Sequence, residues 1–203
     1  MLAAEPAEAQ TRISGSILGG VMEHRVDAGY GVAQARGPVE GGEIAVQRGA
    51  RFALVVRGQV GTLTASGPGA TDRDVAEVGV AASVVTVSWL ALQGGVTRRS
   101  YSTVLARQRW TTVHVGAEAR LPFGGSAVSG IVRGALLPVV SVNGLEGPDV
   151  AFTAAAGMEY GWERLVLGAF YSLERYDFPM QGAARRLEQL TAFTLRVGLR
   201  PRR

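Results

Sequence analysis

The chain has 203 residues and a formal net charge of +4, and all 21 of its basic residues are arginine. Because it has no cysteine, disulfide scaffolds, thiolate zinc sites and cysteine nucleophiles are excluded. The arginines are scattered along the chain, which argues against a nucleic-acid partner. No apolar run approaches the length of a membrane-spanning helix.

The composition of the sequence divides the chain into two regions. Residues 1–11 are predicted to be either a remnant of a secretory signal peptide or a disordered tail, because Ala7-Glu8-Ala9 resembles the small-x-small end of such a peptide. Residues 12–203 are expected to form one domain, because no polar or Pro/Ser-rich linker divides them.

Alternation of apolar and polar residues predicts an all-β protein. In the segment 109–121, Val113 and Val115 fall on one face, whereas His114 and Glu118 fall on the other, as a two-faced strand requires. Similar patterns recur along the chain. We expect about ten strands, at 12–26, 42–48, 52–65, 75–88, 92–101, 109–121, 126–139, 150–161, 165–176 and 188–199.

Two segments depart from simple alternation. In 12–26, Ile17 and Val21 share a face with Glu23, so the alternation is expected to end or slip near Met22. In 75–88 the apolar face changes parity after residue 84, which predicts a β-bulge there. Merging of two neighbouring segments would leave eight strands, which is the alternative to ten.

The joints between the segments are short and long by turns. Turns are expected at 49–50, 90–91, 122–125 and 162–164, and longer loops at 27–41, 66–74, 102–108, 140–149 and 177–187. One large aromatic lies at each short joint, and others lie near the opposite rim. Aromatic rings favour the membrane interface of a β-barrel, in girdles that flank the lipid-facing band. The candidate membrane-interface aromatics are Phe52, Trp89, Phe123 and Trp162 at the short joints, and Tyr101, Trp110, Tyr176 and Phe178 at the other rim.

If the apolar faces contact lipid, the opposite faces line a lumen. Interleaved arginine and glutamate there predict a network of ion pairs, because buried charge must be paired and a small barrel fills its interior with side chains. The planar guanidinium of arginine can bridge two carboxylates. A polar pore or substrate tunnel is the alternative interpretation. The predicted lumen charge network consists of Arg57, Glu77, Arg99, His114, Glu118, Arg120, Arg133, Glu159, Glu174 and Arg196.

Over about residues 12–199 the chain resembles small, single-domain outer-membrane β-barrel proteins of bacteria. The resemblance implies an antiparallel up-and-down transmembrane barrel with short periplasmic turns and longer external loops, surrounded by outer-membrane lipid. The segment from Phe193 to Leu199 is similar to the C-terminal strand that the barrel-assembly machinery reads in such proteins. The family typically closes with an aromatic residue, whereas this chain continues through Arg200 to Arg203.

No pattern of residues indicates catalysis, a cofactor or a metal site. A nucleophilic triad needs three converging groups, and the two histidines are expected elsewhere: His114 within the lumen network and His24 as a solvated residue at the rim. Asp72 and Asp74 supply too few oxygens for Ca²⁺. We therefore predict no enzyme and no cofactor.

The sequence thus favours a non-enzymatic outer-membrane barrel with a lumen filled by Arg/Glu pairs. Its role would be structural, surface interaction or a narrow conduit. The alternative is a soluble or periplasmic lipocalin-like barrel that binds a small apolar ligand, with its apolar faces turned inward. An outer-membrane enzyme acting on lipid or peptide is a third hypothesis, and it lacks a catalytic constellation.

Overall fold

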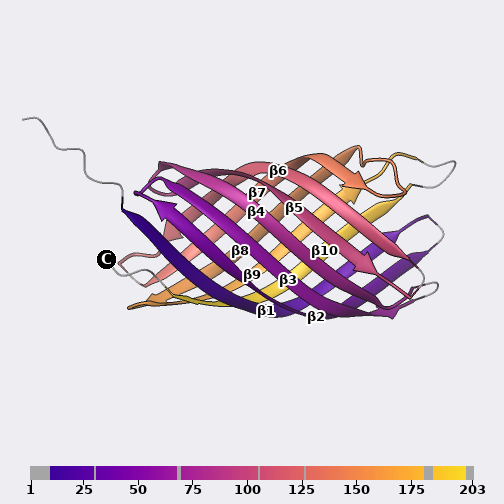
Figure 1. Cartoon of the computed structure of the whole chain (residues 1–203), viewed down its shortest axis with the longest axis horizontal. Coiled ribbons are helices and arrows are strands. Elements are labelled where there is room, and N and C mark those ends of the chain that lie inside the picture. Colours follow the sequence, from indigo (N-terminus) through magenta and orange to yellow (C-terminus); the bar gives the residue numbers. More distant parts are fainter. Residues whose placement is uncertain are drawn as a thin grey trace, which may run out of the picture.

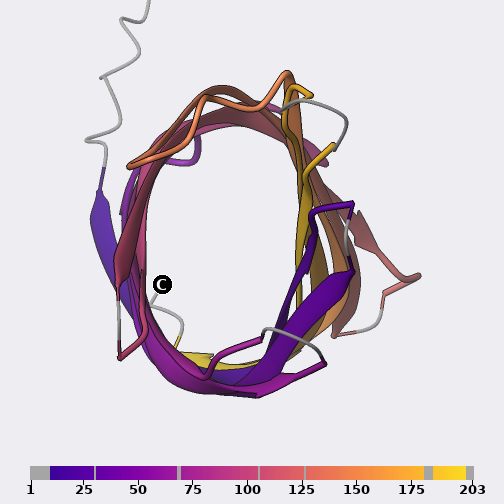
Figure 2. The same ribbon diagram turned by 90° about the vertical axis from the view of Figure 1, so that its right-hand side faces the viewer.

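The computed structural model describes residues 10–29, 31–67, 70–104, 106–125, 127–180 and 185–199. Ten antiparallel strands form a closed barrel (Figure 1; Figure 2). The strands are β1 (Thr11–Asp27), β2 (Val32–Arg48), β3 (Phe52–Ser66), β4 (Arg73–Val87), β5 (Leu90–Ser102), β6 (Arg107–Pro122), β7 (Val128–Val142), β8 (Val150–Trp162), β9 (Leu165–Asp177) and β10 (Leu187–Leu199). Across the described ranges, no helix has the length and apolar character to cross a membrane. The expectations for residues 1–9 and 200–203 concern residues outside these ranges.

Each strand pairs with its neighbours in sequence, and β1 closes the barrel against β10. That closing ladder is unbroken, from Gly15 opposite Leu199 to Asp27 opposite Leu187. The predicted ten-stranded up-and-down barrel is therefore confirmed, and the eight-stranded alternative is wrong. The start of β1 and the end of β10 lie at the same rim as the short turns (Figure 1). We call this the short-turn rim and the opposite end the loop rim.

Strand β2 is much longer than predicted. The sequence indicated a strand at 42–48 after a long loop at 27–41, but β2 begins at Val32. Gly37 and Pro38 resemble chain breakers, and the pairing with β3 is indeed interrupted at these two residues, because proline has no N–H to donate. The ladder resumes in the same register at Val39, and Pro38 still lies opposite Val21 of β1.

The strand faces follow the alternation, with two local shifts. The predicted bulge in the fourth strand is confirmed, because the β4–β5 register shifts between Val85 and Val87. A second shift was missed: β7 has one extra residue where it passes β6, close to Pro138. Of the two alternatives predicted near Met22, the slip is wrong, because the ladders of β1 continue in register on both sides to Asp27. The apolar alternation ends there instead, because Glu23 and Arg25 keep the parity of the outward Val21.

Large apolar side chains point outward around the barrel, which places the charged faces inside. In the middle of β10, for example, Leu195 is 55% exposed, whereas its neighbour Arg196 lies on the inner side. The lipocalin-like alternative requires apolar faces that point inward, so the orientation of these side chains contradicts it. Outward apolar residues on the strands include Ile17, Ile44, Leu54, Val56, Val60, Val80, Leu92, Val96, Val115, Leu136, Met158, Phe193 and Leu195.

Candidate functional site in the barrel lumen

The inward side chains form successive layers along the barrel axis. Along β9, Tyr176 lies near the loop rim, Glu174 follows, and Phe170 is further toward the short-turn rim. All three side chains line the inside because they share one parity of the strand. The layers are an apolar plug near the loop rim, two clusters of ion pairs, and a charged pocket at the short-turn rim.

An apolar plug fills the lumen near the loop rim. Its largest members are Trp110, Tyr176 and Phe178, each 1% exposed. The ring of Trp110 makes edge contacts with Tyr176 and Phe178, at centroid distances of 4.9 and 6.1 Å. The other buried members of the plug are Met22, Ala35, Val39, Leu63, Val75, Tyr101, Leu137, Val142, Ala151 and Leu190.

The prediction of interface aromatics is wrong at the loop rim. Tyr101, Trp110, Tyr176 and Phe178 are each 3% exposed or less and lie inside the barrel, so they do not contact lipid. The three strand aromatics share the parity of predicted lumen residues, as Tyr101 does with Arg99. That parity was a readable signal, which the argument from position alone overlooked.

The aromatics at the short-turn rim behave differently. Phe52, Trp89, Phe123 and Trp162 are 49–62% exposed. Their placement at the membrane interface stays a prediction.

Arg99 is the centre of the first charge cluster. Its Nε donates to Glu77 Oε2 at 2.6 Å, and its two terminal nitrogens donate to both oxygens of Glu174 at 2.8 and 3.0 Å. Glu77 also accepts hydrogen bonds from Gln59, at 3.2 Å, and from Arg57, at 3.4 Å. The Arg99 side chain is only 5% exposed, so a guanidinium that bridges the buried carboxylate of Glu77 and the half-buried one of Glu174 satisfies three charges together.

A second cluster lies nearer the short-turn rim. Arg133 donates to Glu118 at 2.6 Å, and Arg120 lies 3.7 Å from the same carboxylate. Arg120 and Arg196 both pair with Glu159, whose side chain is 3% exposed. Carboxylates and guanidiniums therefore alternate across β6, β7, β8 and β10.

Nine of the ten residues predicted for the lumen network form such pairs. The tenth, His114, is half-buried, lines an internal cavity of about 310 Å³ between the clusters, and has no ion pair within the described residues. Sequence reasoning missed Glu43, which pairs with Arg196 at 3.3 Å, although residue 43 lay within the predicted strand 42–48 and opposite in parity to the outward Ile44.

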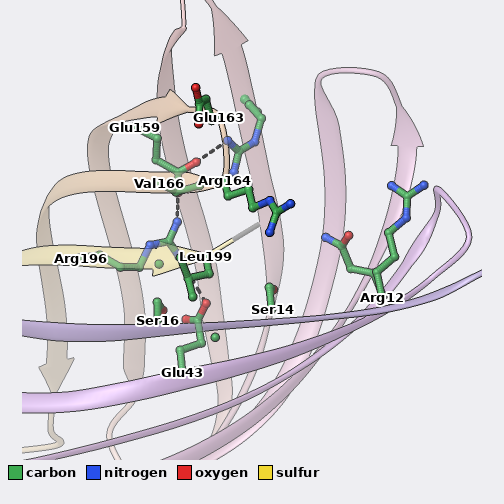
Figure 3. A pocket seen from close by; sticks show the side chains of 14 residues that line it. Arg12, Ser14, Ser16, Glu43, Glu159, Glu163, Arg164, Val166, Arg196 and Leu199 are labelled. Atoms are coloured by element: carbon green, nitrogen blue, oxygen red, sulfur yellow. Dashed lines mark hydrogen bonds and ion pairs between the residues drawn. The ribbon is translucent and has the colours of Figure 1, made fainter. Parts of the chain in front are cut away.

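A wide pocket of about 780 Å³ opens at the short-turn rim (Figure 3). Arg196 lies between Glu43 and Glu159 in its wall, whereas Arg12, on β1, lies apart from them (Figure 3). The charged residues that line it are Arg12, Glu43, Arg120, Glu159, Glu163, Arg164 and Arg196.

A buried polar network borders the plug. His24 Nε2 lies 2.8 Å from Glu188, and Arg73 lies 3.0 Å from His24 Nδ1. Since arginine can only donate, Nδ1 accepts and Nε2 carries the proton that is donated to Glu188. Arg186 donates to the other oxygen of Glu188 at 2.7 Å, and the His24 ring stacks on Tyr101. His24 is 1% exposed, so its predicted place as a solvated rim residue is wrong.

No protein-family model matches the chain, and no curated protein matches it in sequence. Among solved structures it is similar to the outer membrane protease OmpT from Escherichia coli, with a TM-score of 0.60 and 11% identity over 93% of this chain and 96% of that chain. The translocator domain of the autotransporter NalP from Neisseria meningitidis has a TM-score of 0.48 and 16% identity, covering 95% and 88% of the two chains. For Neisserial surface protein A the values are 0.41 and 13%, covering 92% and 96%.

The protein thus has the fold of small bacterial outer-membrane β-barrel proteins. At these identities the likeness concerns the fold alone. Within the described part of the chain, no group of three or more histidine and acidic residues is placed to hold a metal ion.

Proposed function

We propose that the protein is a non-enzymatic barrel of the bacterial outer membrane, with a closed lumen and a structural or surface-interaction role. The observation that carries this proposal is the division of faces, with large apolar side chains outside and paired charges inside. Both the outer and the inner face of the barrel wall are stabilised when the barrel spans a lipid bilayer.

The outer surface supports a lipid surrounding. Burying one large apolar side chain stabilises a protein by about 1.5–3 kcal/mol, and such side chains project outward from all ten strands. Soluble monomers rarely expose a contiguous apolar patch of this kind. Closure of the barrel gives every strand a hydrogen-bonded neighbour on both sides and leaves no open edge, which hydrocarbon demands.

The inner surface supports a closed barrel more than a narrow conduit. Trp110, Tyr176 and Phe178 pack together across the lumen near the loop rim. The pocket at the short-turn rim therefore leads toward a plugged end. Ion pairs such as Arg99 with Glu174 link β5 to β9, on opposite sides of the barrel order, and brace the wall.

Two features fit insertion from the short-turn side. The half-exposed aromatics of that rim, such as Trp89 and Trp162, would anchor it at the periplasmic interface. The outward row Phe193, Leu195 and Val197 in β10 would be read by the barrel-assembly machinery.

The fold that the protein shares with a protease does not by itself indicate catalysis by this chain. Both ring nitrogens of His24 are engaged by Arg73 and Glu188, and the ring is buried. His114 has no acidic residue within ion-pair distance among the residues described. These contacts support a structural rather than a catalytic role for both histidines.

Refolding with and without a membrane mimic tests the proposal. We expect β-structure by circular dichroism and a discrete monomer by sedimentation only with detergent micelles or phosphatidylcholine vesicles. In planar bilayers the inserted barrel should show no steady conductance, because the plug closes it. A folded monomer in plain buffer would refute the membrane location, and a stable ohmic current would refute the closed lumen.

A further inference from the structure

A separate pocket of about 380 Å³ lies at the loop rim, beside the connections between β5 and β6 and between β7 and β8. Its polar wall contains Arg73, Tyr101, Arg107, Gln108 and Asn143. We call it the loop pocket. The plug separates it from the pocket at the short-turn rim.

The loop pocket has positive charge without matching negative charge. No carboxylate contributes to its described lining, and neither Arg73 nor Arg107 has an acidic partner within ion-pair distance among the described residues. In the lumen, by contrast, Arg99 reaches two carboxylates. Asp72 and Asp74 flank Arg73 in sequence, but their carboxylates accept hydrogen bonds from Ala65 and Thr62 instead.

Tyr101 forms part of the pocket wall but offers no donor to it. Its side chain is 3% exposed, and its hydroxyl oxygen is fully buried. The charged donors in the wall of the loop pocket are therefore those of Arg73 and Arg107.

The buried network behind the pocket holds Arg73 in place. Arg73 donates to His24 at 3.0 Å, and its Nε lies 3.4 Å from the carbonyl oxygen of Thr71. The His24 ring also stacks on Tyr101, with 4.6 Å between centroids, and is itself fixed by Glu188. The network therefore positions the guanidinium of Arg73 at the pocket wall.

We propose that the loop pocket binds an oxyanion, a phosphate or carboxylate group, between the guanidiniums of Arg73 and Arg107. Guanidinium is suited to such groups because its fork of N–H donors matches two oxygens. His24 acts as a positioning residue. The orientation of the loop pocket toward the cell exterior rests on the proposed function. The binding of an oxyanion in the pocket does not depend on it.

The test uses the full chain refolded in neutral detergent micelles, titrated by calorimetry with inorganic phosphate and separately with glucuronate. We expect saturable binding of at least one probe, at least tenfold weaker in Arg73→Gln and in Arg107→Gln. The matched control is Arg51→Gln, which removes the same charge from an exposed residue of the short-turn rim and should leave the affinity unchanged. His24→Gln should weaken binding less than Arg73→Gln.

Arg107 is exposed, so its variant keeps the test valid even if Arg73→Gln fails to fold. Absence of saturable binding of both probes, or an equal loss in Arg51→Gln, would overturn the proposal. Micelles doped with phosphatidylglycerol distinguish the two sources of the anion. If the pocket binds a lipid headgroup, this lipid should weaken the apparent affinity for inorganic phosphate. If it binds a free anion, that affinity should stay the same. Folding in plain buffer would refute the membrane location but leave the phosphate titration intact.

Discussion

A charge placed at the centre of the lipid-facing band is expected to cost far more than the same charge at the loop rim. On β3 the outward side chains are apolar from Phe52 to Val60 and polar from Thr62 onward, so Val56 marks the middle of the band. Val56 is 44% exposed on the outer face. Arginine at the bilayer midplane of a β-barrel destabilises it by about 2–4 kcal/mol.

Ser66 supplies the matched control on the same strand and face. The ten residue steps from Val56 to Ser66 span ~33 Å of strand, or ~25 Å along the membrane normal at a tilt of ~40°. Since the apolar band is only ~25 Å tall, Ser66 lies ~12 Å beyond its edge. We therefore expect Ser66→Arg to change the free energy of unfolding by less than about 1 kcal/mol.

The assay is urea unfolding of both variants in phosphatidylcholine vesicles, followed by tryptophan fluorescence. A loss of about 3 kcal/mol in Val56→Arg corresponds to roughly a 150-fold change in the unfolding equilibrium constant. Equal destabilisation by the two arginines, or a loss below about 1 kcal/mol in Val56→Arg, would refute the assignment of the apolar face to lipid.

Two further predictions concern the lumen. Arg99→Leu leaves the carboxylates of Glu77 and Glu174 without their shared cation and should lower the free energy of unfolding in micelles by about 3–5 kcal/mol; a loss under about 1 kcal/mol would show that these charges do not depend on one another. Gly157→Val places its side chain against the ring of Phe170 and should cost about 1–3 kcal/mol. Gly134→Ala, where no atom lies within 4 Å of the added carbon, should be close to neutral, and similar losses at both glycines would contradict the packing.

Most of the fold could be predicted from the sequence, because a strand with lipid on one side and charge on the other alternates without ambiguity. Strand β6 is such a case, and His114 and Glu118 lie on the inner face as its parity requires. Strand β2 could not be predicted in full, because Gly37 and Pro38 are typical of turns. Only pairing with β1 on its other side keeps the chain extended there.

The candidate site could be predicted where residues were assigned to a face by strand parity. It could not be predicted where residues were assigned only by their position near a loop. Arg99 and Glu77 were assigned to the lumen by parity, and they meet there. Trp110 and Tyr176 were assigned to the interface by their nearness to loops, although their parity points inward. His24 was placed in solvent because Glu188 and Arg73, far away in sequence, carry no local signal of their contact.

The central claim is that the apolar face of each strand contacts lipid. Because the chain has no cysteine, single cysteines with a fluorescent label can be placed at successive residues of β10, and quenching by brominated lipids in vesicles reports contact with the bilayer. Strong quenching is predicted at Phe193, Leu195 and Val197 and weak quenching at Ala192 and Thr194. Equal quenching at all five residues, or stronger quenching at Ala192 and Thr194, would contradict the account.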